Sequence, residues 1–183
     1  MKFKSVLAFL MFIAPAVAMA QGRIGSSEMN GEVPRVEIAG AYSYLHASAS
    51  GFNVSAPLGF DADTSVNVNS WFGIEGNLAY NRKSQSGAAV SLTSYTVGPR
   101  FTYRSGRLAV FAHALVGGER LSAGGFGFSA ATNAVAYGGG GGVSITVINH
   151  FAIRAVEVDY LTGSKYGTRL NTIRVGTGVV ARF

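Results

Sequence analysis

Apolar and polar residues alternate along most of this chain with a period of two, which is the period of a β-strand and not of a helix. The pattern is clearest at the C-terminus, where Val175, Val179 and Phe183 share one parity and Arg174 and Arg182 share the other. After residue 20 no segment shows a convincing run of apolar residues at helical spacing. We therefore predict an all-β chain.

The alternation divides the chain into eight strand-like segments separated by turn residues. They cover residues 35–45, 59–70, 73–82, 92–104, 107–120, 131–147, 150–161 and 170–183. The connections alternate in length: long loops are expected at 46–58, 82–91, 121–130 and 162–169, and short turns at 69–73, 104–107 and 147–150. All long loops then gather at one end of the fold, as in outer-membrane barrels with short periplasmic turns and longer extracellular loops.

The two faces of the strands distinguish a barrel in lipid from a barrel in water. One parity is bulky and apolar, and the other consists mostly of Gly, Ala, Ser, Thr and Asn. A soluble barrel would carry charges freely on its water-facing parity, yet only 13% of this chain is charged, against about 25% in soluble domains. We predict an eight-stranded antiparallel up-and-down transmembrane β-barrel, with the small parity in the lumen. A soluble exported lipocalin-like ligand-binding barrel is the alternative.

The N-terminus carries an export signal. Lys2 and Lys4 precede an apolar run that ends at a small-residue cleavage site, Ala18-Met19-Ala20. We predict a signal peptide over residues 1–20, a periplasmic lead over 21–34 and the barrel over 35–183. The formal net charge of +6 includes the two lysines of the signal, and the remaining basic residues form no cluster, so nucleic acid is not an expected partner.

Several segments resemble one family. They are "AGAYSYLHA", "NSWFGIEGNLAY", "YTVGPRFTYRSGRLAVFAHALVGGER", "HFAIRAVEVDYL" and "RVGTGVVARF". With them the chain resembles the small outer-membrane β-barrels that include the OmpA transmembrane domain and OmpX, and in particular the "porin family" barrels. The resemblance implies location in the bacterial outer membrane. The terminal aromatic is similar to the signal that the outer-membrane insertion machinery recognises.

Ionisable residues on the small parity are expected inside the barrel, where they are costly unless they pair. The candidates are Glu37, Glu75, Arg100, His113, Glu119, Glu157, Asp159, Arg174 and Arg182. Two interpretations stay open. The residues form an ion-pair network that fills the lumen and fixes the strand register, or the same network gates a narrow, low-conductance path.

Aromatic residues near the ends of the strands are expected at the two membrane interfaces. They are Tyr42, Tyr44, Trp71, Phe72, Tyr80, Tyr103, Tyr160 and Phe183. Phe183 is predicted to face lipid at the periplasmic interface and to take part in insertion.

Catalytic chemistry finds little support. His113 with Glu119 or Asp159 and a serine would suit a hydrolase, but no serine lies in a nucleophile motif. The three histidines, His46, His113 and His150, lack ligand spacing, so neither a metal site nor a cofactor is predicted. The glycine run at 138–142 lacks the lysine and the helix of a phosphate loop, and we expect it to relieve crowding in a strand.

We therefore expect an outer-membrane protein with a structural or surface-interaction role, no enzymatic activity and at most a narrow, low-conductance permeability. The alternative is an outer-membrane barrel enzyme that acts on lipid or peptide. Expected partners are outer-membrane lipid, the insertion machinery and lipopolysaccharide, and the barrel is expected to be a monomer. The loop residues expected to contact lipopolysaccharide are Arg82, Lys83, Lys165 and Arg169.

Overall fold

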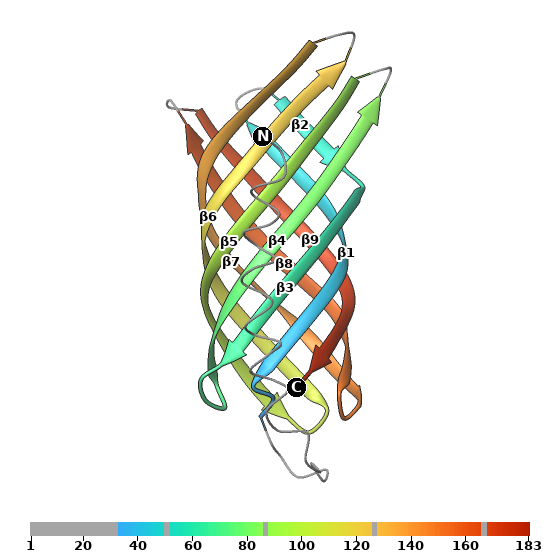
Figure 1. Cartoon of the computed structure of the whole chain (residues 1–183), viewed down its shortest axis with the longest axis vertical. Coiled ribbons are helices and arrows are strands. Elements are labelled where there is room, and N and C mark those ends of the chain that lie inside the picture. Colours follow the sequence, from blue (N-terminus) through green and yellow to red (C-terminus); the bar gives the residue numbers. More distant parts are fainter. Residues whose placement is uncertain (1–32, 50–51, 86–87, 126–127, 166–167) are drawn as a thin grey trace.

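In a computed structural model the chain forms a closed antiparallel β-barrel (Figure 1). The structure describes residues 33–49, 52–85, 88–125, 128–165 and 168–183, so the predicted signal peptide and nearly all of the lead lie outside the described residues. Within these ranges the strands are β1 (Val36–Ala49), β2 (Phe52–Ala56), β3 (Leu58–Asn67), β4 (Phe72–Gln85), β5 (Ala88–Ser105), β6 (Leu108–Gly125), β7 (Phe128–Ile148), β8 (Phe151–Lys165) and β9 (Thr168–Arg182). No helix among them is both long and apolar enough to cross a membrane.

The segments β2 and β3 are two halves of one barrel strand, because both pair with β1. The barrel therefore has eight strands, which confirms the predicted fold. Leu45 pairs with Ala56, and Tyr42 pairs with Phe60. Between these two pairs the β2–β3 side has one residue more than β1, so it contains a β-bulge. Pro57 lies at this break, where its missing N–H costs no ladder bond, and the Tyr42 hydroxyl donates to its carbonyl.

The barrel closes where the two ends of the described chain meet. β9 pairs with β1 from Glu37–Arg182 to Ala49–Leu170. Beyond this ladder, the Phe183 N–H donates to the Val36 carbonyl at 2.9 Å, and the Val36 N–H donates to the Phe183 carbonyl at 3.1 Å. The C-terminal residue is therefore part of the sheet, and every strand has a neighbour on both sides.

The expected long loops were wrong, whereas the short turns are confirmed. Strands continue through most of 46–58, 82–91, 121–130 and 162–169; the β5–β6 pairing, for example, extends to Ala88 and Gly125. The alternation of apolar and polar residues is lost there because no apolar medium requires it. Ala130 and Ala131, for example, are adjacent in sequence and both exposed, as is Asn133. At the opposite end the short turns lie near the predicted positions, and Gly106 takes a φ of 55° that favours glycine.

The strands are longer than a membrane requires. The 18 residues of β6 span about 60 Å at 3.3 Å per residue. At a tilt of 35–45° this is a height of about 40–50 Å, against an apolar band of about 25 Å in outer-membrane barrels. The hairpins at the upper end of Figure 1 therefore project beyond the band.

The two faces separate as the alternation predicts. Large apolar side chains such as Val97, Val179 and Phe101 are exposed on the outer surface. All acidic residues in the described part of the chain are buried: Glu37, Asp61, Asp63, Glu75, Glu119, Glu157 and Asp159. A water-soluble lipocalin-like barrel has the reverse arrangement, so that alternative is wrong.

Candidate functional site

The lumen holds a network of ion pairs, which we call the charge network. At the end where the two ends of the described chain meet, the Glu37 carboxylate forms ion pairs with three arginines. Its carboxylate lies 3.3 Å from Arg100, 3.3 Å from Arg104 and 3.1 Å from Arg182. These residues come from β1, β5 and β9, so the cluster ties the closing strands to the far wall of the barrel.

The middle of the charge network is built around two arginines and an aromatic ring. Arg154 contacts Asp63 and lies 2.7 Å from Glu157 Oε2, while Arg100 lies 2.8 Å from Glu75 Oε2. The Phe111 ring is near both cations, with guanidinium carbons 3.9 Å and 4.9 Å from its centroid. Cation–π attraction in a dry interior adds to the ion pairs.

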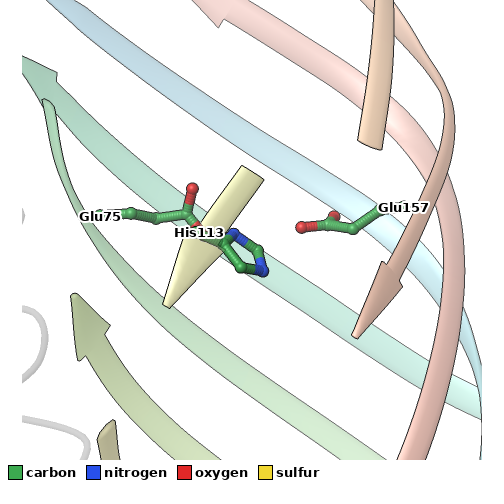
Figure 2. Close-up of side chains that lie close together, drawn as sticks. All are labelled: Glu75, His113 and Glu157. Atoms are coloured by element: carbon green, nitrogen blue, oxygen red, sulfur yellow. Dashed lines mark ion pairs between the residues drawn. The ribbon is translucent and has the colours of Figure 1, made fainter. Parts of the chain in front are cut away.

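His113 lies between three carboxylates. Its Nε2 is 2.8 Å from Asp159 Oδ1 and its Nδ1 is 3.0 Å from Glu75 Oε1. Figure 2 shows the imidazole between Glu75 and Glu157, which approach it from opposite sides. Arg174 forms an ion pair with Asp159 Oδ2 and also lies 2.9 Å from the Asp61 carboxylate.

A glycine on β7 makes the His113–Asp159 contact possible. Gly140 is paired with His113 on one side and with Asp159 on the other, so the two side chains meet across it. A Cβ at this position would lie 2.1 Å from Asp159 Oδ1, 2.8 Å from His113 Nε2 and 2.4 Å from the Val158 carbonyl oxygen. The glycine run relieves crowding, as predicted, and here it serves the charge network.

An apolar cluster lies toward the opposite end of the lumen. Inward-facing residues of β1, β2, β5, β6 and β9 pack together, and we call this cluster the apolar cap. It consists of Leu45, Ala47, Ala56 and Leu92, with Leu121 and Leu170 packed against them. The charge network is therefore covered by hydrocarbon on the side of the projecting hairpins.

All nine predicted lumen residues face the interior, and eight of them take part in ion pairs. Glu119 is the exception: it is 1% exposed, and neither carboxylate oxygen has a hydrogen-bond partner among the described residues. Sequence reasoning missed Asp61 and Asp63, although both lie on the small parity. It also missed Arg104 and Arg154.

Arg154 could not be found from parity. It shares its parity with Val156 and Val158, which are both exposed. A β-bulge between Arg154 and Glu157 gives β8 one extra residue, so that Ala155 and Val156 both face outward and the charged pair both face inward. The Arg154 carbonyl at the bulge accepts a hydrogen bond from the Thr177 hydroxyl at 2.9 Å.

The predicted aromatics lie on the outer surface in two groups. Those at the end with the short turns are Trp71, Phe72, Tyr103 and Phe183, and those toward the hairpins are Tyr42, Tyr44, Tyr80 and Tyr160. Phe72 is only half-buried by its neighbours, with ring centroids 5.7 Å from Trp71 and 5.5 Å from Phe101. Tyr95, Phe101, Tyr137 and Phe151 are further exposed aromatics that were not predicted. Contact with the membrane interfaces stays a prediction.

The sequence matches the family model described as "Outer membrane protein beta-barrel domain" over residues 5–183. The chain belongs to this family. No curated protein sequence matches it significantly. Membership, together with the fold, places the protein in the bacterial outer membrane.

Solved structures with this fold agree at low sequence identity. Neisserial surface protein A (NspA) is 13% identical with a TM-score of 0.71, and the match covers 81% of this chain and 97% of that one. Ail, the attachment invasion locus protein of Yersinia pestis, is 19% identical with a TM-score of 0.59, over 81% and 99%. OprG of Pseudomonas aeruginosa is 10% identical with a TM-score of 0.55, over 86% and 99%. These similarities show a shared architecture.

Proposed function

We propose that this protein is a non-conducting scaffold of the outer membrane, with its role at the outer surface. The observation that carries the proposal is the filled lumen. The charge network occupies the interior from Glu37 to Asp159, and the apolar cap follows toward the hairpins. The interior of an eight-stranded barrel is just wide enough for side chains, so these layers leave little room for continuous water.

The same arrangement argues against an enzyme that acts on lipid or peptide. His113 is 5% exposed, and its ring nitrogens face Glu75 and Asp159. A substrate would have to pass the apolar cap or the Glu37 cluster to reach the imidazole. We therefore assign His113 to the interior of the scaffold.

A pair of arginines on the outer wall supports a surface role. Arg120 on β6 and Tyr80 on β4 both pair with Thr93 on β5. Arg82 lies two residues beyond Tyr80 on β4, opposite Ser91. Both arginines are exposed and stand on either side of β5, with Cα atoms about 12 Å apart by strand spacing and rise. We call them the basic rim.

The basic rim has the chemistry to bind phosphate groups of lipopolysaccharide. It lies just beyond the tyrosines on the hairpin side, where headgroups meet the barrel. No acidic residue of the described chain lies on the outer surface to compete for the arginines. Guanidinium groups bind phosphate through paired hydrogen bonds, which favours this ligand over a neutral sugar.

Planar-bilayer recording tests the closed lumen. The refolded barrel should give no conductance steps above background, while a general porin inserted in the same bilayer gives large ones. Regular steps from the pure barrel would contradict the proposal.

Binding of lipopolysaccharide tests the basic rim separately. The double variant Arg82→Gln/Arg120→Gln should bind it about 5–30-fold more weakly than wild type, because two exposed charge contacts each contribute about 0.5–1 kcal/mol. Arg35→Gln/Arg107→Gln, an exposed pair at the other end, is the matched control and should bind normally. Equal losses of affinity in the two double variants would show non-specific attraction and contradict the proposal. Dephosphorylated lipopolysaccharide should bind the wild type and the two double variants equally.

A further inference from the structure

Three side-chain atoms that could bind a metal ion converge in the lumen. Glu75 and Glu157 each use Oε2 to bind an arginine, at 2.8 Å and 2.7 Å, and neither Oε1 binds an arginine of the described chain. His113 Nδ1 lies 3.0 Å from Glu75 Oε1 and has no further hydrogen-bond partner among the described residues. A ligand atom from each of these three residues lies within 4.8 Å of the other two (Figure 2).

The tautomer of His113 makes this convergence unfavourable on its own. Asp159 accepts a hydrogen bond and cannot donate one as a carboxylate, so Nε2 carries the proton in the 2.8 Å contact with Asp159 Oδ1. In a neutral imidazole Nδ1 then carries a lone pair 3.0 Å from Glu75 Oε1. Buried acceptors that face one another are stabilised by a cation between them, either a proton on Nδ1 or a metal ion.

The charge balance of the lumen points the same way. Seven buried carboxylates face five guanidiniums, those of Arg100, Arg104, Arg154, Arg174 and Arg182. Seven minus five leaves two negative charges when His113 is neutral. A bound cation near His113 therefore improves the charge balance of the lumen.

We propose that Glu75, His113 and Glu157 bind one divalent transition-metal ion of the Zn²⁺ class inside the barrel. Imidazole nitrogen with carboxylate oxygen suits zinc and its neighbours, whereas calcium and magnesium prefer oxygen alone. An ion 2.0–2.2 Å from its ligands separates tetrahedral donors by about 3.4 Å. The 3.0 Å between His113 Nδ1 and Glu75 Oε1 is close to that value, and a ligand atom of Glu157 lies within 4.8 Å of those of the other two residues.

The residues around the site match what a metal-bound histidine requires. In metal sites, a carboxylate that accepts a hydrogen bond from the other ring N–H orients the imidazole and raises its basicity. Asp159 has this role for His113. Arg174 holds Asp159, and Gly140 leaves the space for the contact. The ion would be structural, since it joins β4, β6 and β8 across the lumen.

Metal content is the direct test. The barrel is folded in the presence of Zn²⁺, freed of loose ions by gel filtration and analysed for bound zinc, with about one ion per chain expected. Glu157→Gln, which keeps the side-chain shape, should lower the affinity at least tenfold, and Asp159→Asn should lower it about 10–100-fold as a positioning residue. Glu119→Gln is the matched control, because it changes a buried carboxylate of the same lumen outside the cluster, and it should retain the ion.

Two further measurements keep the outcome clear if a variant folds poorly. Cobalt bound to the wild-type barrel should show the visible absorption of a low-coordinate site with a nitrogen ligand, and a chelator present during folding should lower the resistance of the wild type to heat. A wild-type barrel that retains no zinc, or equal retention by wild type and Glu157→Gln, would overturn the proposal. In that case a protonated His113 bridges Glu75 and Asp159, and the chelator has no effect.

Discussion

Arg154 holds together the middle of the charge network through Asp63 and Glu157. Replacing it with methionine keeps most of the volume and removes the cation, which takes the ion-pair partner from Glu157 and leaves Asp63 with only the 3.6 Å contact to Arg100. We expect Arg154→Met to lower the free energy of unfolding by about 3–5 kcal/mol, measured by urea unfolding in detergent or vesicles. The exposed Arg107, replaced in the same way, should change stability by less than about 0.5 kcal/mol. A small effect of Arg154→Met would mean that the network does not stabilise the barrel.

At the scale of residues, the alternation predicted which side chains lie inside wherever the strands are regular. Arg100 and Arg174 followed from it directly, because polar residues on a small parity have no other place in a closed barrel. The partners did not follow. The contact of Arg154 with Asp63 joins β8 to β3 across the lumen, and no local pattern encodes a distance across the interior.

The bulge in β8 is the clearest case where an element departs from its sequence pattern. Arg154 and Glu157 are paired with Gly178 and Gly176 on β9, so two residues of β8 lie opposite one of β9. On β7, Ser144 and Val143 pair with Arg154 and Val156 and leave Ala155 without an opposite residue. Removing Ala155 restores regular pairing on both sides and keeps Arg154 and Glu157 inside.

We therefore expect deletion of Ala155 to give a folded barrel, with a modest loss of stability from the strand bend. Deletion of Val158 on the same strand should not, because it turns Asp159 or the charged residues before it toward lipid, at a cost of several kcal/mol. The difference in gel mobility between unboiled and boiled protein reports folding in both cases. A folded Val158 deletion, or an unfolded Ala155 deletion, would contradict this account of the bulge.

The last strand gives a second prediction at this scale. Phe183→Ala removes an exposed aromatic ring and should lower stability by about 1–3 kcal/mol through lost apolar contact with lipid. If the insertion machinery recognises Phe183, the variant should accumulate unassembled in the periplasm to a greater extent than this loss explains. Arg182→Ala, which faces the lumen beside Glu37, is the comparison and should insert nearly normally. Wild-type levels of both variants in the outer membrane would end the insertion hypothesis.

At the scale of the whole molecule, the outer surface changes from lipid-facing to water-facing along each strand. Ile145 and Asn133 lie on the same outward face of β7, about 40 Å apart along the strand by the rise per residue. A cysteine at Asn133 should react with a water-soluble thiol reagent on intact cells, and a cysteine at Ile145 should stay unlabelled until detergent is added. Labelling at Asn133 only after the outer membrane is broken would reverse the orientation of the barrel.

The eight-stranded barrel was predictable because lipid enforces one strict rule over its whole height. Where that rule stops, the prediction fails: the sequence predicts loops for the projecting parts of β5, β6 and β7, since no lipid imposes alternation on their outer face. The apolar cap was missed for a related reason. Leu45, Leu92 and Leu121 fall on the small parity of strands whose other lumen residues are mostly small or polar.

The hydrogen bonds between Val36 and Phe183 have a consequence for the order of folding. They join residues 147 positions apart (183 minus 36), so the contact that completes the sheet is also among the most distant in sequence. Such contacts form slowly, because the entropy of closing the loop is lost before the contact forms. Until then β1 and β9 each present an unpaired edge that can join another chain. The time between synthesis and closure is thus the period in which this protein most needs a carrier to keep it apart from its copies.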